Sequence, residues 1–293
     1  MTETAPAADA GSDTAADTGS AAKADAAGVD DATADQAERP LVEGDLVLLV
    51  DAKGRRYLVT LAAGTEFQTH AGVVPHEQLI GRSEGIVVST TKGQRFTAYR
   101  PSLSDYILAM PRGAQVIYPK DIGPILMLAD IEPGCRVFES GVGSGALSMG
   151  MLRTGATIVG YELREDFAAR ATKNVRGFLG PDVLDRYDVH LQDSYQGIDH
   201  TGFDRAVLDL PEPWRVVPHL ADAMRPGAIV VSYSPSIIQV TKTREALDRA
   251  GFAEASTMEV LNRNWHIDGN AVRPDHRMVA HTGFLTRARR PAR

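Results

Sequence analysis

Residues 137–147 have the sequence V-F-E-S-G-V-G-S-G-A-L, which begins as an apolar strand and ends as the start of a helix. Three glycines, Gly141, Gly143 and Gly145, lie in the connection between them. Glycine is favoured where a turn is tight and where a ligand must approach the backbone closely. A strand, a glycine-rich loop and a helix in this order predict a nucleotide-binding unit.

Strands and helical stretches alternate after this loop, which predicts a doubly wound parallel sheet. We expect strands at 135–139, 157–161, 187–191, 204–209 and 228–233, and helices at 166–178 and 240–250. Three acids, Glu162, Asp193 and Asp209, fall at the ends of predicted strands. Because ligands of open α/β sheets bind at the carboxyl ends of the strands, these acids are candidate binding residues.

The glycine loop alone leaves the cofactor class open. The pattern Gly141-x-Gly143-x-x-Ala146 also matches dinucleotide-binding loops. Glu162 could accept hydrogen bonds from the ribose of NAD or of S-adenosylmethionine. Asp193 favours S-adenosylmethionine, since a carboxylate there could bind the adenine amino group. A dehydrogenase would also need a His, a Tyr-Lys pair or a metal for hydride transfer, and we find none beside the predicted site.

A second loop, D-L-P-E-P-W at 209–214, puts a carboxylate, two prolines and an indole at a strand end. With four other stretches it carries a resemblance to the bacterial and archaeal tRNA (adenine-58-N1)-methyltransferases, the TrmI family, from about Val42 to Thr286. These stretches are R-P-S-L-S-D-Y-I-L-A-M-P-R at 100–112, Q-V-I-Y-P-K-D at 115–121, F-E-S-G-V-G-S-G-A-L at 138–147, and H-T-G-F-L near the end. Pro211 departs from the family's usual aspartate loop, but Asp209 remains.

The resemblance implies a Rossmann-like class I methyltransferase with a seven-stranded, mostly parallel sheet whose antiparallel end pair is 255–261 and 278–286. It implies methyl transfer from S-adenosylmethionine to N1 of adenosine 58 in the T-loop of tRNA, by a homotetramer. Whether position 57 is also modified is open. Other readings are a methyltransferase for another RNA adenosine or a non-RNA substrate, and a non-catalytic tRNA-binding subunit.

Adenine N1 already has an in-plane lone pair, so catalysis requires alignment of the reacting atoms and stabilisation of the cationic ring. We expect Asp209 to accept a hydrogen bond from the N6 amino group. The resemblance places Tyr118 at the pocket mouth, where it could stack on the flipped base or hold the surrounding chain. Trp214 is a stacking residue or a packing anchor. The residues predicted to bind the donor are Gly141, Gly143, Ser144, Gly145, Ala146, Leu147, Glu162, Phe167, Asp193 and Gln115.

The charges divide the chain at residue 39. Residues 1–39 hold nine acids and two bases and no Leu, Ile, Phe, Tyr or Trp, so we expect a disordered acidic tail. The whole chain has 31 Lys and Arg against 38 Asp and Glu, which leaves 29 of each after residue 39. A neutral body must cluster its bases to bind tRNA.

We predict four segments: the tail (1–39), a small β domain (40–99), a helical bridge (100–130) and the methyltransferase domain (131–293). The β domain should contain hairpins at 46–50 with 56–61 and at 86–89 with 95–99. In the bridge, Ser104-Asp105 should cap one helix and Asp121 a second that runs from Ile125 to Asp130.

The single cysteine, Cys135, excludes an intrachain disulfide and a thiolate metal cluster, which fits a reducing cytoplasm. No metal site is predicted. No apolar run approaches the ~18 residues that a membrane-spanning helix requires.

Overall fold

The computed structural model describes residues 39–113 and 115–292. The predicted acidic tail, apart from Arg39, lies outside the described residues. Within the described part of the chain, no helix is long and apolar enough to cross a membrane.

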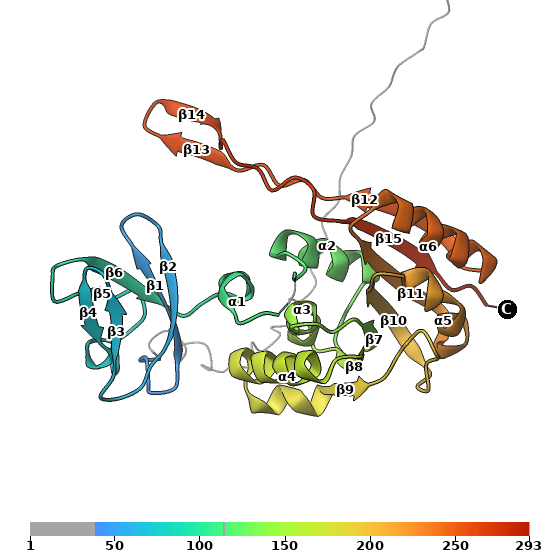
Figure 1. Cartoon of the computed structure of the whole chain (residues 1–293), viewed down its shortest axis with the longest axis horizontal. Coiled ribbons are helices and arrows are strands. Elements are labelled where there is room, and N and C mark those ends of the chain that lie inside the picture. The colour runs from blue at the N-terminus through green and yellow to red at the C-terminus, as the bar shows by residue number, and fades with distance from the viewer. Residues whose placement is uncertain (1–38, 114, 293) are drawn as a thin grey trace, which may run out of the picture. The chain divides into compact units, whose positions relative to one another are not determined.

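A seven-stranded sheet carries the second half of the chain, with the strand order β12-β15-β11-β10-β7-β8-β9 (Figure 1). Its strands are β7 (Arg136–Ser140), β8 (Thr157–Glu162), β9 (Tyr187–Leu191), β10 (Phe203–Asp209), β11 (Met224–Ser234), β12 (Ala253–Glu259) and β15 (Phe284–Arg289). Only β15 runs antiparallel to its neighbours, β11 and β12. The predicted sheet is therefore confirmed. From β7 the chain adds β8 and β9 on one side, and then β10 and β11 on the other side of β7. The strand order therefore reverses between β7 and β10, and ligands bind at such a topological switch point.

The central strands β8, β7, β10 and β11 are buried along most of their length because helices cover both faces of the sheet, whereas the edge strands β9 and β12 are mostly exposed or half-buried. Val137 packs into one core cluster and its neighbour Phe138 into another, as alternation along a strand requires. Helices α2 (Pro119–Ala129), α3 and α4 contribute to the first cluster, and α5 and α6 to the second. The helices of this region are α3 (Ala146–Arg153), α4 (Glu165–Leu179), η2 (Pro181–Arg186), η3 (Pro213–Arg215), α5 (Val217–Ala223) and α6 (Ile237–Arg249).

A separate four-stranded sheet, with the order β2-β1-β6-β5, forms from residues before 100. Its elements are β1 (Leu46–Asp51), β2 (Arg56–Thr60), β3 (Glu66–Thr69), β4 (Gly72–Pro75), η1 (His76–Gln78), β5 (Val87–Ser89) and β6 (Arg95–Tyr99). Both predicted hairpins are confirmed, and β1 also pairs with β6. The hairpin of β3 and β4 was not predicted, because its strands have only four residues each.

Two helices follow, α1 (Leu103–Ala109) and α2 (Pro119–Ala129). The cap of α1 is Ser102, which forms a capping box with Asp105, so the prediction of a cap at Ser104 was two residues late. The prediction that Asp121 caps a helix starting at Ile125 was wrong. Because Pro119 is preorganised for the first helical position, α2 starts there and Asp121 lies inside it, fully buried.

Between β12 and β15 the chain leaves the sheet as an arm, residues 260–282. The arm includes the hairpin of β13 (Trp265–Asp268) and β14 (Ala271–Pro274), which projects from the sheet in Figure 1. The predicted strand 278–286 was therefore wrong over its first six residues, since β15 begins at Phe284.

Candidate active site

A cleft of about 450 Å³ opens at the carboxyl ends of β7, β8, β9 and β10. It is lined by Gln115, Ser140, Gly141, Gly143, Tyr161, Glu162, Leu163, Arg164, Phe167, Gln192, Asp193, Ser194, Tyr195, Asp209, Leu210 and Pro211. Seven predicted site residues line the cleft: Gln115, Gly141, Gly143, Glu162, Phe167, Asp193 and Asp209. Ser144, Gly145, Ala146, Leu147 and Tyr118 do not. The structure therefore brings the glycine loop, three acids and the aspartate loop together.

Gly141 allows the glycine loop and the aspartate loop (209–214) to approach each other closely. Its φ is +86°, and a Cβ built on it would lie 2.0 Å from the carbonyl oxygen of Asp209. Any other residue would push the aspartate loop away and would also adopt the left-handed conformation unfavourably. Glycine is therefore required at 141 by the position of the Asp209 backbone.

The start of α3 presents backbone groups rather than side chains. Gly145 is the N-cap of α3 with φ +80°, and the side chains of Ala146 and Leu147 are buried in the core. The first N–H groups of a helix have no partner within it and form an anion-binding end. The hydroxyl of Ser144 is buried without a hydrogen-bond partner among the described residues. Ser144 follows Gly143, which does line the cleft, so this unsatisfied hydroxyl is a polar group next in sequence to the cleft lining.

Glu162 is held rigidly at the end of β8. One carboxylate oxygen accepts a hydrogen bond from the backbone N–H of Gly143 at 2.9 Å, and the other from that of Arg164 at 3.0 Å. The residue is only 8% exposed. Each oxygen keeps a further lone pair, so the carboxylate can also accept bonds from a ligand's hydroxyl groups.

Asp193 and Phe167 both line the cleft. Asp193 accepts a hydrogen bond from the backbone N–H of Tyr195 at 3.0 Å, which fixes its turn. The guanidinium of Arg164 lies 3.9 Å from the ring centre of Phe167. An acid and a flat apolar ring in one cleft suit a planar heterocycle with an amino group.

Asp209 ends β10 and pairs across the sheet with Tyr233 of β11. Burial, with a further contribution from the charge of Glu162, raises the pKa of Asp209 from 3.8 to about 7. A carboxyl with such a pKa can accept a proton near neutral pH. The carboxyl that we predicted to act on the substrate is therefore one that titrates in the working range of an enzyme.

Glu139 is an acid of the cleft region that the sequence interpretation missed. It is 2% exposed, and burial, followed by the charges of Asp209 and Glu162, raises its pKa to about 8. Ser148 donates a hydrogen bond to its carboxylate at 2.7 Å, and Tyr187 donates to Ser148 at 3.1 Å. Glu139 lies within the quoted glycine motif, two residues before Gly141, so its position in that motif was the available signal.

Several wall residues of the cleft, Arg164, Gln192 and Tyr195 among them, were also missed. They lie in irregular loops, where side-chain direction does not follow from periodicity. Tyr195 accepts a hydrogen bond from the backbone N–H of Glu212 at 3.1 Å, so it joins the loop after β9 to the aspartate loop after β10.

The two uncertain aromatic residues lie outside the cleft lining. Tyr118 is the N-cap residue of α2. Trp214 packs against the second core cluster, with the ammonium of Lys242 4.8 Å from its ring centre. This packing favours the interpretation of Trp214 as an anchor.

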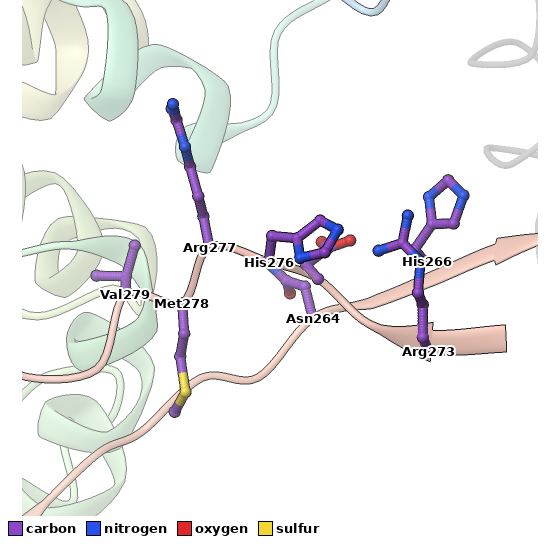
Figure 2. A pocket seen from close by; sticks show the side chains of 8 residues that line it. Asn264, His266, Arg273, His276, Arg277, Met278 and Val279 are labelled. Atoms are coloured by element: carbon purple, nitrogen blue, oxygen red, sulfur yellow. The ribbon is translucent and has the colours of Figure 1, made fainter.

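A second, larger cavity of about 920 Å³ lies on the arm and shares no lining residue with the cleft. Figure 2 shows its imidazole and guanidinium side chains, including His266, Arg273 and His276, which extend from the arm strands and the loop after them. The glycine loop and the three acids of the cleft are absent from its lining, so we place the chemistry in the cleft.

A family model described as "tRNA methyltransferase complex GCD14 subunit" matches residues 99–272, and one described as "TrmI-like N-terminal" matches residues 40–88. The chain is 36% identical to the tRNA (adenine(58)-N(1))-methyltransferase TrmI of Thermus thermophilus, over 83% of this chain and 96% of that one. This chain belongs to the GCD14/TrmI family of tRNA methyltransferases. The resemblance predicted from the sequence is thus confirmed.

Other members of the GCD14/TrmI family have related activities in their names. The Methanocaldococcus jannaschii relative is named for adenine 57 as well as adenine 58; it is 35% identical over 83% of this chain and 94% of its own. The solved tRNA (m1A58) methyltransferase TrmI of Aquifex aeolicus superposes with a TM-score of 0.77 at 28% identity and covers 87% of this chain and all of that one.

A solved protein of Thermotoga maritima, described as a SAM-dependent O-methyltransferase, has a TM-score of 0.82 at 30% identity over 86% of this chain and 95% of that one. These structures confirm the class I methyltransferase fold of this family member.

Proposed function

We propose that this enzyme transfers a methyl group from S-adenosylmethionine to N1 of adenosine 58 in tRNA. The observation that carries the proposal is the position of Asp209, a half-buried carboxyl with a pKa of about 7, beside the glycine loop at the switch point. The names of the relatives from Thermus and Aquifex support the substrate and the position.

The cleft residues fit the donor. In our proposal Glu162 accepts hydrogen bonds from the ribose hydroxyls, because its two oxygens are already fixed by backbone N–H groups. Asp193 accepts from the adenine amino group, Phe167 packs on the adenine, and Gln115 contacts the methionine part. The unpaired hydroxyl of Ser144, with backbone groups of Gly145, Ala146 and Leu147, provides further polar contacts. The donor supplies a methyl group activated by a sulfonium charge.

Asp209 acts on the acceptor. Attack by N1 leaves positive charge on the adenine ring and makes the N6 amino group acidic. The Asp209 carboxylate accepts a hydrogen bond from N6, stabilises that charge and can then take the proton. A keto group at the same place would present an acceptor to an acceptor, so the carboxylate also selects adenine. Tyr118 stacks on the base after it is turned out of the T-loop.

We further propose a cytoplasmic homotetramer that binds tRNA. Support comes from the arm, where Trp265 is 56% exposed, Ile267 72% and Val272 59%. Three large apolar side chains gathered on one hairpin are typical of an interaction surface.

O-methylation of another substrate is the second candidate, favoured by the structural similarity to the Thermotoga protein. A carboxyl with a pKa of about 7 could also remove the proton of an acceptor hydroxyl. The two chemistries give different products, since O-methylation of RNA marks a ribose and N1-methylation marks a base.

The test is transfer of labelled methyl groups from S-adenosylmethionine to an unmodified tRNA transcript, compared with the same transcript carrying guanosine in place of adenosine 58. The labelled RNA is digested, and its nucleosides are separated. Label in 1-methyladenosine that disappears with the guanosine transcript supports the proposal, and a transcript altered at position 57 reports the second position. Equal labelling of both transcripts, or label in a ribose-methylated nucleoside, refutes it.

A further inference from the structure

Lys120 and Asp121, the last two residues of the Y-P-K-D stretch, form a buried ion pair. Their side chains are 9% and 0% exposed, and the Lys120 Nζ lies 2.8 Å from Asp121 Oδ1. The other carboxylate oxygen accepts a hydrogen bond from the Thr282 hydroxyl at 2.6 Å. Buried charges are costly unless they are paired and fully hydrogen-bonded, and this pair meets both conditions.

The same ammonium joins the two ends of the arm. Lys120 Nζ donates to the backbone carbonyl of Val260 at 2.7 Å and to the Thr282 hydroxyl at 2.6 Å. Val260 is the first residue after β12, and Thr282 lies two residues before β15. All three N–H groups of Lys120 are therefore used, and they fix the points where the arm leaves and rejoins the sheet.

From Thr282 the connection continues to Tyr233, which lies opposite Asp209 in the sheet. The Tyr233 hydroxyl donates to the Thr282 carbonyl at 2.6 Å. A Cβ built on Gly283 would lie 2.4 Å from the Tyr233 ring, so the backbone of 282–283 packs directly on that ring. Burial, followed by hydrogen-bond and charge effects that include Asp121, Asp209 and Tyr118, sets the pKa of Tyr233 at about 12, so the hydroxyl keeps its proton for this bond.

We propose that Lys120 is a positioning residue for methyl transfer: it holds the base of the arm so that the Thr282 carbonyl fixes Tyr233 beside Asp209. This inference rests on the proposed function, because its test measures the rate of methyl transfer. It explains why the Y-P-K-D and H-T-G-F-L stretches, about 160 residues apart, serve one site. The donor side of the cleft, with Glu162 and Asp193, does not contact Lys120, so donor binding should not depend on it.

The test compares two changes at the pair. Lys120→Met alone leaves the buried Asp121 charge without its partner and should lower Tm. Lys120→Met with Asp121→Asn removes that charge while nearly keeping side-chain volume, so Tm should recover. We expect the single-turnover rate of methyl transfer to stay about tenfold or more below wild type in the double variant, because the methionine side chain donates no hydrogen bond to Thr282 or to Val260. The dissociation constant for S-adenosylmethionine should stay within about twofold.

A merely structural role is excluded by repeating the pair of changes in a Tyr233→Phe background, which already lacks the bond to Thr282. In that background the double change at Lys120 and Asp121 should lower the rate less than about threefold, since Tyr233→Phe has already broken the same connection. Equal fold-losses in the two backgrounds, or a wild-type rate in the double variant, would overturn the proposal. Lys173→Met, which removes an exposed lysine on α4, is the control.

Hydrogen exchange separates this proposal from the proposed function. Backbone amides around Val260 and Thr282 should exchange faster in the double variant than in wild type, whether or not the enzyme modifies tRNA. Unchanged exchange there refutes the connection through Lys120. If the wild-type protein transfers no methyl group to tRNA but exchange is faster in the double variant, the proposed function is refuted and the connection through Lys120 is supported.

Discussion

Asp209→Asn should make the protein more stable and the enzyme much less active. The pKa of this carboxyl rises from 3.8 to about 7 on folding, chiefly because the group is buried. A shift of roughly three units corresponds to about 4 kcal/mol, an upper limit on what ionised Asp209 costs the folded state. Asparagine has nearly the same shape and never ionises, so it removes this cost.

The sign of the pH dependence follows from the raised pKa. Below about pH 4 the carboxyl is protonated in both states and costs nothing. Between about pH 4 and pH 7 the unfolded state ionises while the folded state keeps its proton, so stability falls as pH rises. Above about pH 7 the full cost applies. The stabilisation by Asp209→Asn should therefore be about 2 to 3 kcal/mol larger at pH 8 than at pH 5.

Urea unfolding of the donor-free protein at the two pH values measures this difference. Asp166→Asn is the control, since a hydrogen bond from Arg164 lowers the pKa of that exposed carboxyl and the change should not stabilise at pH 8. Turnover of Asp209→Asn at pH 8 should fall by about 10² to 10³, while donor binding persists. Equal stabilisation at pH 5 and pH 8 would show that burial does not raise this pKa, and near-normal turnover would show that another group assists the transfer.

Three further changes test other parts of the structure. Gly141→Ala should cost several kcal/mol, roughly the 1 to 2 of a left-handed alanine plus the clash with the Asp209 carbonyl, and should lower both Tm and turnover; an unchanged Tm would contradict the close approach. Glu162→Gln should weaken binding of S-adenosylmethionine about tenfold or more by calorimetry, because an amide must turn its NH₂ toward the N–H of Gly143 or Arg164. Trp265→Ser should reduce the mass measured by light scattering if the arm joins subunits, and an unchanged mass would remove the arm from that role.

The centre of the sheet was predictable because its strands are buried on both faces and contain apolar runs. Phe203–Asp209 and Thr157–Glu162 lie within one residue of the predicted strands. The positions of Glu162 and Asp209 were predictable because both follow or end such strands, and the carboxyl ends of parallel strands meet at one edge of the sheet. The seven-stranded order and the antiparallel end pair came from the resemblance, because periodicity does not determine which strands are neighbours.

What escaped prediction depends on contacts distant in sequence. Asp121 resembled a helix cap by its local sequence, but its partner Thr282 lies 161 residues away. The arm could not be seen because its strands have four residues each and alternate weakly. Glu139 was inside the most informative motif, yet only the structure shows it buried between Ser148, Asp209 and Glu162.

The three acids Glu139, Glu162 and Asp209 lie on three adjacent strands, β7, β8 and β10, and their electrostatic interaction explains why the cleft suits a cation. Burial is the first cause of the raised pKa of Glu139, and the charges of Asp209 and Glu162 add to it. A positive ligand in the cleft would favour the ionised forms of Glu139 and Asp209 and so offset part of the cost of burying them. The donor is cationic at sulfur before transfer and neutral there afterwards. In the proposed function the same acids therefore favour the donor over its product, and Asp209 is then free to stabilise the charge that moves to the adenine.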